Sequence, residues 1–312
     1  MSAKKVIVHA PASSANIGPG HDSLAMALEL RDDIIFEVLA EGESEAITLT
    51  EDGSPSGEDL PTGRTNLAIR AFEAVFLEVG KRPPSVRVTT VNRIPIARGL
   101  GSSAAAIVAG VAAGNLFCGG HLDMQGRLNL AARIKGHPDN TAACTLGGVT
   151  VSSLVGSRVM WAKVPLPREL RALVVVPGFG VPTGVARNVL PGSVLHADAT
   201  FNVSRVALLV ASLCTGAYEN LRYATEDKLH QPYRSPLVPG MLDAIRSACD
   251  AGALGAYMSG AGPSILALMG PETDHEPIAR AIAEAFGRSR VSVSNTMALS
   301  LATTGVTWEA EE

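Results

Sequence analysis

Residues 94–115 constrain what this chain can fold into more than any other stretch. They begin Ile-Pro-Ile-Ala-Arg-Gly-Leu-Gly-Ser-Ser and continue as a run rich in alanine. Gly99 and Gly101 predict a tight turn whose backbone can approach a ligand closely. Ser102 and Ser103 stand where the N-cap of a helix belongs. A helix start after glycines presents free N–H groups and the positive end of the helix dipole, so the stretch predicts a phosphate site.

Two other nucleotide motifs compete with this interpretation. A Walker A loop requires lysine at the helix start, and no lysine follows Gly101, so that motif is excluded. Gly99, Gly101 and Ala104 loosely fit a dinucleotide fingerprint, and Asp123 lies near the distance of a ribose-binding acid. That acid should end a second strand, whereas Asp123 follows two glycines in a predicted helix start. The dinucleotide site remains the weaker alternative.

The same stretch resembles the phosphate loop of the GHMP kinases, which include galactokinase, mevalonate kinase and homoserine kinase. Other segments extend the resemblance over nearly the whole chain and indicate the homoserine kinase family in particular. They are residues 11–22, 136–140, 183–191, 229–234 and 259–264. The resemblance implies that ATP is held by Pro95, Ile96, Ala97, Arg98, Gly99, Leu100, Gly101, Ser102, Ser103, Ala104 and Ala105.

The family resemblance also implies a reaction and a fold. The reaction is transfer of the ATP γ-phosphate to the side-chain hydroxyl of L-homoserine, with Mg²⁺, in threonine biosynthesis. The fold is α+β, with an N-terminal nucleotide domain like domain 2 of ribosomal protein S5 and a C-terminal ferredoxin-like α/β plait. We place the domains at residues 1–165 and 166–312. The alternatives are a sibling kinase of another small alcohol, such as mevalonate, and a catalytically silent nucleotide-binding relative.

An amino-acid alcohol offers an ammonium, a carboxylate and a hydroxyl. Asp22 can pair with the ammonium, and Asn16 can bond to it or orient Asp22. Arg187 and Arg234 can clamp the carboxylate, because a guanidinium fork matches it bidentately. By resemblance, Asn140 holds the reacting hydroxyl in line with phosphorus. The resemblance places two further residues at the substrate, Thr183 and Gly260.

Two neighbours of Asn140 have open roles. His137 either lines the site or caps a local turn. Asp139 is a candidate base, although Asn140 is better placed by resemblance to meet the hydroxyl, so the base stays unassigned. Phosphoryl transfer depends mainly on positioning and charge neutralisation, and it needs no protein nucleophile.

Lys135 departs from the family pattern. The residue before Gly-His-Pro-Asp-Asn is usually glutamate, a Mg²⁺ ligand, and here it is lysine. The metal would then be held by ATP itself and by Ser102 or Ser103, of which we favour Ser102. Helical spacing places Lys135 with apolar residues, and its ammonium is expected to point at the phosphates. Snorkelling to solvent at the helix end and loss of catalysis are the alternatives.

The amino-acid composition indicates which binding partners and which cellular compartment to expect. A net charge of −4, with 46% hydrophobic and 18% charged residues, gives no general attraction to nucleic acid or to an anionic membrane. No stretch of about twenty apolar residues is expected. The four cysteines lack metal or disulfide spacing, which indicates free thiols in a reducing compartment. We therefore expect a cytoplasmic protein and, by family, a homodimer.

Hydrophobic periodicity predicts the elements. Expected strands are 5–9, 34–40, 46–50, 86–91, 147–154, 173–176, a strand–turn–strand at 256–268 and a final strand. Expected helices are 23–28, 67–79, 122–135, 200–215, 241–251 and 277–286, besides the one after the phosphate loop. The remaining segments are expected as a loop at 11–22, a surface excursion at 53–63, a linker at 158–171, a loop carrying Thr183 and Arg187, and a polar break at 229–234. This irregular order favours α+β.

Overall fold

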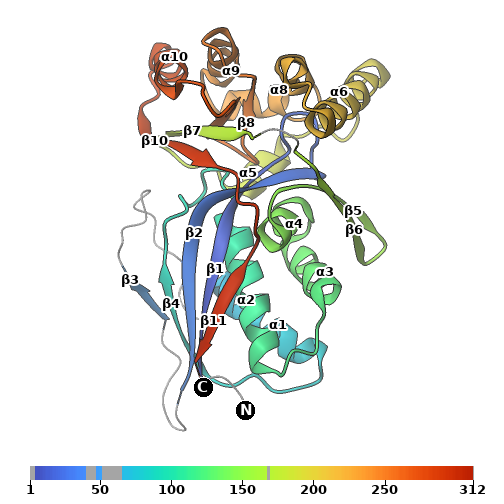
Figure 1. The fold of residues 1–312 in the computed structure, drawn as a ribbon, viewed down its shortest axis with the longest axis vertical. Coiled ribbons are helices and arrows are strands. Elements are labelled where there is room, and N and C mark those ends of the chain that lie inside the picture. Colours follow the sequence, from blue (N-terminus) through green and yellow to red (C-terminus); the bar gives the residue numbers. More distant parts are fainter. Residues whose placement is uncertain (1–3, 40–46, 51–64, 167–168, 312) are drawn as a thin grey trace.

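The computed structural model describes residues 4–39, 47–50, 65–166 and 169–311, arranged as two sheets with their helices, one above the other (Figure 1). The first sheet has the strand order β11-β1-β2-β4-β3, with β5 paired to β2 and β6 to β5. Its strands are β1 Lys5–Ala15, β2 Leu24–Val38, β3 Ile47–Thr50, β4 Val86–Val91, β5 Val149–Val155, β6 Arg158–Val164 and β11 Thr307–Glu311. Its helices are α1 Leu67–Glu78, α2 Ser102–Phe117, α3 Met124–Lys135 and α4 Asp139–Leu146. The excursion expected at residues 53–63 lies outside the described residues.

The second sheet is antiparallel, in the order β10-β7-β9-β8. Its strands are β7 Arg171–Pro177, β8 Gly255–Met258, β9 Ile265–Met269 and β10 Val293–Ser300. The helices α9 Met241–Asp250 and α10 His275–Arg288 cover one of its faces (Figure 1). Four more helices precede β8: α5 Thr183–Asn188, α6 His196–Thr215, α7 Leu221–Ala224 and α8 Gln231–Arg234. This strand order is that of a ferredoxin-like plait, so the expected C-terminal fold is confirmed.

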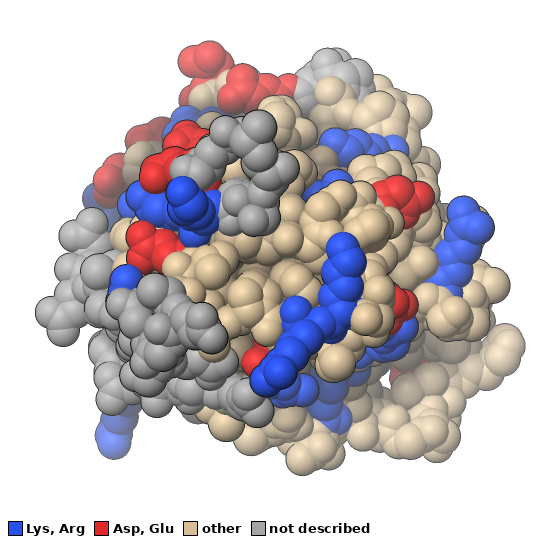
Figure 2. Space-filling model, turned by 90° about the horizontal axis from the view of Figure 1, so that it is seen from below, with Lys and Arg blue, Asp and Glu red and all other residues tan. Residues whose placement is uncertain are grey.

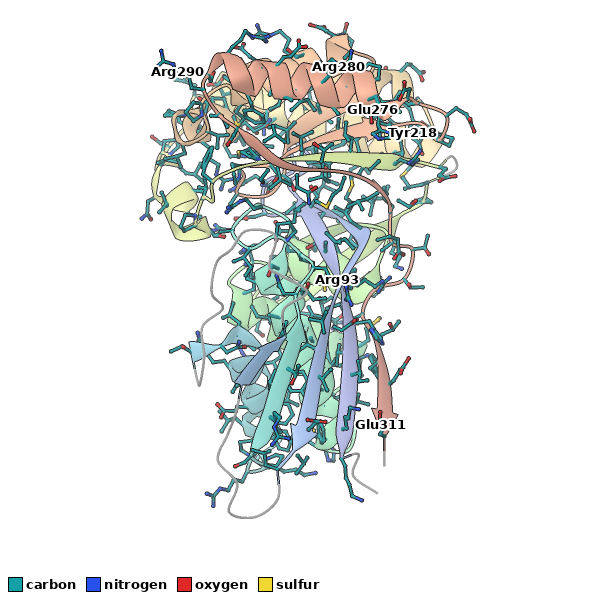
Figure 3. The ribbon with its side chains drawn as sticks, turned by 90° about the vertical axis from the view of Figure 1, so that its left-hand side faces the viewer. Arg93, Tyr218, Glu276, Arg280, Arg290 and Glu311 are labelled. Atoms are coloured by element: carbon teal, nitrogen blue, oxygen red, sulfur yellow. The ribbon has the colours of Figure 1, made fainter. Side chains whose placement is uncertain are left out.

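The last strand returns to the first sheet. β11 pairs antiparallel with β1, and the Lys5 ammonium lies 3.0 Å from the Glu311 carboxylate. Figure 3 shows Glu311 at the far end of the first sheet, well away from Arg280 on α10. A division at residues 165 and 166 separates β6 from β7, which lie in different sheets, but the chain crosses back after β10.

Two expectations for the first hairpin are wrong. Residues 24–28, expected as part of a helix, form the start of β2. Leu24, Met26 and Leu28 face the main core, while Ala25 and Ala27 pack in a separate alanine cluster that includes Ala143 of α4. A strand buried on both faces is continuously apolar, and its pattern does not differ from that of a short buried helix.

Residues 11–15, expected as loop, continue β1. The register between β1 and β2 shifts between Pro11 and Ala12, which is where a proline is tolerated within a sheet. Three further segments differ from expectation because short elements carry weak periodicity. Residues 158–164 of the expected linker form β6, the loop with Thr183 and Arg187 is the short helix α5, and the polar break contains α8.

Small residues bring α1 and α2 together. A Cβ atom on Gly110 of α2 would lie 2.2 Å from the carbonyl oxygen of Ala68 in α1, and one on Gly114 would lie 2.7 Å from that of Phe72. The close contact buries the Phe72 ring, which stacks on Phe36 of β2. The alanine- and glycine-rich helix therefore holds the phosphate loop rigidly on the core of the first sheet.

The face shown in Figure 2 carries both basic and acidic side chains of the described residues. The four cysteines are free, as expected. By length and composition alone, α6 is able to cross a membrane, although its sequence includes His196, Asp198 and Arg205. Its Arg205 and Asp198 pair with Glu226 and Lys228 of the loop between α7 and α8. Helices on proteins that never enter membranes pass the same test, so α6 carries no membrane assignment.

Candidate active site

A cavity of about 280 Å³ is lined by residues from both parts of the chain. It brings together nearly all the residues that the sequence singled out. They are Asn16, Asp22, residues 95–103, Lys135, His137, Asp139, Asn140, Thr183, Arg187, Arg234 and Gly260. Ala104 and Ala105 are buried behind this wall, and their N–H groups donate to the carbonyl of Gly101 within the first helical turn.

The phosphate loop has the predicted glycine geometry, with one correction. Gly99 and Gly101 adopt left-handed φ angles of 75° and 76°, which favour glycine. The N-cap of α2 is Gly101, so Ser102 and Ser103 lie inside the first turn and do not cap it. Among the described residues, the N–H groups of both serines have no acceptor. Free N–H groups at a helix start that lines a cavity are suited to an anion.

Contacts with the second part of the chain fasten this loop. The Ser259 hydroxyl donates to the carbonyl of Gly99 at 2.7 Å and bonds to the Ser14 hydroxyl at 2.7 Å. A Cβ atom on Gly99 would lie only 2.1 Å from the Ser259 carbonyl oxygen. The turn between β8 and β9 thus closes directly against the phosphate loop, which explains why glycine is required at position 99.

The acidic residue that the dinucleotide alternative requires, Asp123, has another role in the structure. Asp123 is the N-cap of α3, and its carboxylate accepts a hydrogen bond of 2.7 Å from the Gly126 N–H. Asp123 does not line the cavity. It acts as a helix cap, so the phosphate-loop interpretation stands without its main competitor.

Asn140 lies beside the phosphate loop. Its side-chain oxygen accepts a 2.8 Å hydrogen bond from the Ser13 hydroxyl, and its backbone N–H donates to the Asp139 carboxylate at 2.7 Å. A Cβ atom on Gly101 would come within 3.1 Å of the same Asn140 oxygen. Among the described residues the Asn140 amide nitrogen has no acceptor, so it is available to a ligand in the cavity.

Lys135 ends α3 with its ammonium in the cavity wall. The ammonium donates to the Ser103 hydroxyl at 2.5 Å. Burial lowers the pKa of Lys135, which the nearby Asp139 carboxylate partly offsets. A buried ammonium beside the positive end of α2 is poorly solvated and repelled by the dipole, and an anion would relieve both effects. The expectation that Lys135 is not freely solvated is confirmed.

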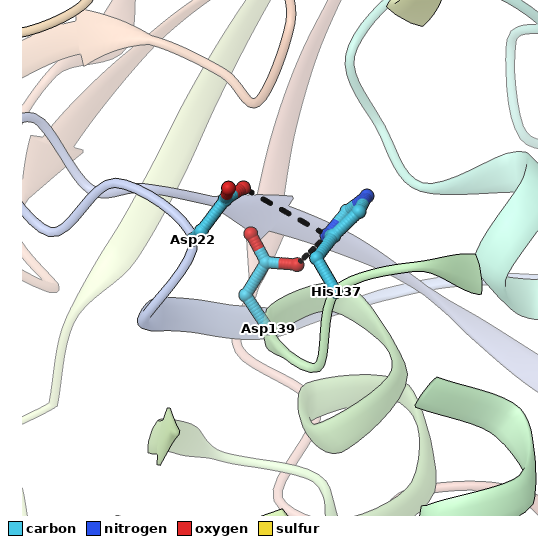
Figure 4. Close-up of side chains that lie close together, drawn as sticks. All are labelled: Asp22, His137 and Asp139. Carbon is cyan, nitrogen blue, oxygen red and sulfur yellow. Dashed lines mark hydrogen bonds and ion pairs between the residues drawn. The ribbon is translucent and has the colours of Figure 1, made fainter. Parts of the chain in front are cut away.

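Asp22, His137 and Asp139 all line the cavity, and their side chains lie close together (Figure 4). His137 Nδ1 donates to the Asp139 carboxylate and lies 4.0 Å from that of Asp22. One ligand atom from each residue lies within 4.8 Å of the others. Both carboxylates, however, already bond to donors or cations of the protein. The hard cation Mg²⁺ prefers oxygen ligands in an octahedron, so this cluster is a poor fit for it.

Asp22 and Arg187 form a two-pronged ion pair across the cavity, with nitrogen–oxygen distances of 3.1 and 2.6 Å. The Arg187 hydrogen bonds hold the pKa of Asp22 below its usual value against the effect of burial, and His21 adds to this lowering. Asn16 accepts from the Asp22 N–H at 3.1 Å and donates to the Gly260 carbonyl at 2.8 Å. Asn16 and Asp22 have left-handed φ angles of 72° and 56°, a strain typical of binding sites.

Arg234 is 3% exposed. Its guanidinium donates to the carbonyls of Ala186 and Gly260 and to the imidazoles of His21 and His230. Most of its N–H groups are therefore committed to the protein, which differs from the free fork expected from the sequence. Thr183 lies on the first turn of α5, beside Arg187 and at the rim of the cavity.

Sequence reasoning missed one end of the cavity. Its lining residues there come from β2, from β4 and the residue after it, from the start of α1 and from α2, and they are Asp32, Ile34, Asn66, Leu67, Ala68, Thr90, Asn92 and Ala106. Asn66 caps α1 by accepting from the Ala68 N–H at 2.8 Å. An N-cap asparagine before an apolar helix is a signal for a helix start, but nothing in it marks a binding site.

Comparisons with known proteins agree with this geometry. The family model for the GHMP kinases N terminal domain matches residues 66–148, and that for the GHMP kinases C terminal matches residues 209–288. The chain is 42% identical over 286 residues to the homoserine kinase of Moorella thermoacetica, covering 91% of this chain and 94% of that protein. It is 42% identical over 264 residues to the homoserine kinase of Caldicellulosiruptor bescii, covering 85% and 84%.

A solved structure gives the same result. The crystal structure of homoserine kinase from Cytophaga hutchinsonii superimposes with a TM-score of 0.85 at 28% identity, covering 98% of both chains. The predicted two-domain α+β architecture is thereby confirmed. The chain belongs to the GHMP kinases, and within them to the family of the homoserine kinases.

Proposed function

We propose that this protein transfers the γ-phosphate of ATP to the side-chain hydroxyl of L-homoserine, giving O-phospho-L-homoserine for threonine biosynthesis. One observation carries the proposal. A single cavity joins a glycine-formed helix start, suited to phosphate, to a set of one carboxylate and two guanidinium groups, suited to an amino acid. The family membership supports the same reaction.

The acceptor end matches a zwitterion. Asp22 and Arg187 pair with each other in the free cavity. An amino acid that inserts its ammonium beside Asp22 and its carboxylate beside Arg187 keeps both charges paired, so opening the protein's own ion pair costs little net electrostatic energy. Arg234 adds one contact to the carboxylate, and Asn16 keeps Asp22 in place. Thr183 and Gly260 complete this end of the cavity.

Asn140 and the phosphate loop position the reacting groups. The free amide nitrogen of Asn140 donates to the acceptor hydroxyl oxygen, which attacks the γ-phosphorus as the bond to ADP breaks, and the hydroxyl proton is lost to solvent. Residues 95–105 form the nucleotide side, with the N–H groups of Ser102 and Ser103 toward the phosphates. Positioning and charge neutralisation supply most of the catalysis in such reactions. His137 and Asp139 hold Asp22 and Asn140 in position. No catalytic base is assigned.

The residues present fit a Mg²⁺ ion carried by the nucleotide better than one held by the protein. In the part of the chain that the structure describes, no carboxylate contacts the start of α2, where Lys135 contacts Ser103. The Ser102 hydroxyl lines the cavity and has no protein hydrogen bond among the described residues, so it is the one candidate ligand there. Bound with ATP, Mg²⁺ would neutralise phosphate charge, and the Lys135 ammonium supplies further positive charge from the protein.

The apolar end of the cavity accommodates the nucleoside. Ile34, Leu67 and Ala106 present aliphatic surface there, and the polar groups of Asn66 and Asn92 lie beside it. A mostly apolar pocket with a few polar groups is typical of sites for flat heterocycles. In this proposal the cavity binds the adenine base at one end, the phosphates in the middle and the acceptor at the other end.

The experiment that tests this function is an ADP-release assay with ATP and Mg²⁺. Homoserine, threonine, mevalonate and galactose are compared as acceptors. We expect homoserine to be used far better than the others, since only an amino acid provides both charges. Preference for mevalonate would establish the sibling-kinase alternative, and ATP binding without turnover of any acceptor would establish the silent relative.

Partners and location follow from the same proposal. We propose a cytoplasmic homodimer that binds neither nucleic acid nor membrane. Size-exclusion chromatography with light scattering measures the oligomeric state, and a monomer would contradict this part.

A further inference from the structure

Arg234 makes four hydrogen bonds that use most of its donor groups. Its Nε donates to the Ala186 carbonyl at 3.0 Å, and its Nη1 donates to the Gly260 carbonyl and to His230 Nδ1, both at 3.2 Å. Its Nη2 donates to His21 Nε2 at 3.3 Å. A guanidinium has five N–H groups, so among the described residues one N–H on Nη2 has no acceptor, and Arg234 lines the cavity. A ligand contact made by a single N–H group depends on how firmly the protein fixes the orientation of the guanidinium.

His230 holds this guanidinium through a single tautomer. Its Nε2 lies 2.7 Å from the Gly18 carbonyl oxygen, which only accepts, and its Nδ1 faces the guanidinium, which only donates. The proton must therefore be on Nε2 and the lone pair on Nδ1. An imidazolium would direct a second N–H at the cation. The side chain of His230 is completely buried, so no water replaces either partner.

The surroundings of His230 fix its orientation. The Asp227 carboxylate accepts from the backbone N–H groups of His230 and Gln231 at 2.9 and 2.6 Å, which closes the turn before α8. The His21 ring stacks on the His230 ring with their centres 5.0 Å apart. Burial lowers the pKa of His230, as do the Arg234 and His21 charges, while Asp227 opposes them. These groups keep the imidazole neutral.

We propose that His230 is a positioning residue for substrate binding: as the neutral Nε2–H tautomer it ties the Gly18 loop to the Arg234 guanidinium and directs the remaining Nη2 N–H at the acceptor carboxylate. This inference rests on the proposed function. It adds to that function a residue that touches neither substrate nor nucleotide. His21 assists by accepting from Nη2 on the other side.

Two matched substitutions separate this role from a purely structural one. Glutamine in His230→Gln places its amide near Nε2, so it can still donate to Gly18 but offers no acceptor to Arg234. Asparagine in His230→Asn places its amide near Nδ1, so it can accept from Arg234 but does not reach Gly18. His275→Gln, a substitution at the partly exposed start of α10, is the control.

We expect His230→Gln to raise the KM for homoserine by about ten- to a hundredfold, as for loss of one hydrogen bond to a charged group, while the KM for ATP stays within about twofold. His230→Asn should raise the homoserine KM less than His230→Gln, although its smaller side chain lowers Tm more. Equal effects of both variants, or a larger homoserine KM for His230→Asn, would overturn the proposal. An unaltered protein that fails to use homoserine would instead overturn the proposed function.

Nitrogen-15 NMR of the full chain labelled at histidine tests the tautomer without any substitution. The expected spectrum at neutral pH, with the His230 signals assigned by through-bond correlations in the unaltered protein, has a protonated Nε2 and an unprotonated Nδ1 for His230. A proton on Nδ1 would overturn the proposal whether or not the variants fold.

Discussion

The phosphate end and the acceptor end of the cavity are built in different ways. The phosphate end is one continuous segment, residues 95–103, whose binding groups are backbone N–H groups at the start of α2. The acceptor end is assembled from side chains of separated segments, with Asp22 after β1, Arg187 on α5 and Arg234 on α8. Local geometry determines the first, and the packing of the two sheets determines the second.

This difference predicts different sensitivities. A backbone site is damaged by a change in the shape of one turn and tolerates changes in side-chain chemistry. A side-chain site is damaged by loss of any one charge, because its partners remain buried and unpaired. Substitutions ranked by expected effect test this contrast.

The largest effect is expected for Gly101→Val, which should abolish measurable ATP binding, a loss of more than about a hundredfold. The φ angle of 76° is strained for a β-branched residue, and a Cβ atom would lie 2.2 Å from the Ser13 hydroxyl oxygen. The same change displaces Asn140, because Ser13 donates to it. Titration calorimetry measures ATP affinity.

Gly80→Val is the matched control for Gly101→Val. Gly80 has a similar φ of 69°, but no atom lies within 4 Å of its Cβ position. It should lower stability without changing ATP affinity. Wild-type affinity in Gly101→Val would remove the phosphate-loop assignment.

The next effects concern the two arginines. Arg187→Ala and Arg234→Ala should each reduce kcat/KM for homoserine by ~2–5 kcal/mol in transition-state terms, the range for a desolvated pair that loses one partner. Arg234→Ala should also lower Tm, because the Ala186 carbonyl loses its Arg234 donor and the Gly260 carbonyl keeps only the one from Asn16, whereas Arg187 is 38% exposed in its side chain. Steady-state kinetics and thermal unfolding measure both quantities.

Arg246→Ala, a change at a side chain that is 70% exposed on α9, is the control for both arginines and should alter neither quantity. ATP binding should change little in all three variants. The unaltered protein should use homoserinol, which lacks the carboxylate, poorly. Equal use of homoserinol and homoserine would show that Arg187 and Arg234 do not bind the substrate carboxylate.

These two ends also show how much of the site the sequence could predict. Local rules alone placed Gly99, Gly101, Ser102 and Ser103 in the phosphate loop, since glycine conformations and helix starts depend on neighbours in the chain, while the rest of residues 95–105 came from the resemblance. Asp22 and Arg187 were placed in the site by resemblance, but their mutual pairing was not foreseen. That pairing depends on how α5 packs against the first hairpin, a long-range contact without a local signature.

The fold shows the same limit. Long amphipathic helices such as α1 and α10 were predicted nearly to their ends. The start of β2 was mistaken for a helix, because a strand covered on both faces loses the alternation that identifies strands. Among functional candidates, His230 escaped notice because its role depends on burial and on a contact with Gly18, which lies 212 positions away in the sequence.

Lys135 lies where the two ends meet, and its effect should be smaller. Lys135→Met should weaken ATP binding at fixed free Mg²⁺ by about 1–3 kcal/mol, as for loss of a hydrogen bond between charged groups. Lys135→Glu should make ATP binding depend more steeply on Mg²⁺ concentration, since a carboxylate there attracts the ion. Calorimetry at several Mg²⁺ concentrations measures both variants.

Lys163→Met, at an exposed position on β6, controls for the loss of a positive charge. It should leave ATP binding unchanged. If Lys135→Met and Lys135→Glu both keep the wild-type ATP affinity and Mg²⁺ dependence, Lys135 is a bystander, and the phosphate end is served by backbone groups alone.

The smallest effect on activity is expected at Asp32, which anchors the entry to the phosphate loop. Its carboxylate is 2% exposed and accepts from the N–H groups of Arg93 and Ile94 at 2.7 and 2.9 Å. Figure 3 shows Arg93 near the level where the two parts of the molecule meet. Burial raises the pKa of Asp32 from 3.8 to about 6, although both backbone hydrogen bonds oppose the rise.

A carboxyl whose pKa is higher in the folded protein than in the unfolded chain stabilises the fold at low pH. That stabilisation is lost as the pH rises from about 4 through about 6, and at about 1.4 kcal/mol per pKa unit the loss is about 3 kcal/mol. Asp32→Asn keeps an acceptor for both N–H groups but cannot ionise. Its free energy of unfolding, relative to wild type, should therefore rise between pH 4 and pH 7 in urea titrations, with ATP affinity unchanged at pH 7. A constant difference across this range would show that Asp32 ionises as readily in the folded protein as in the unfolded chain, and that the loop entry carries no buried charge penalty.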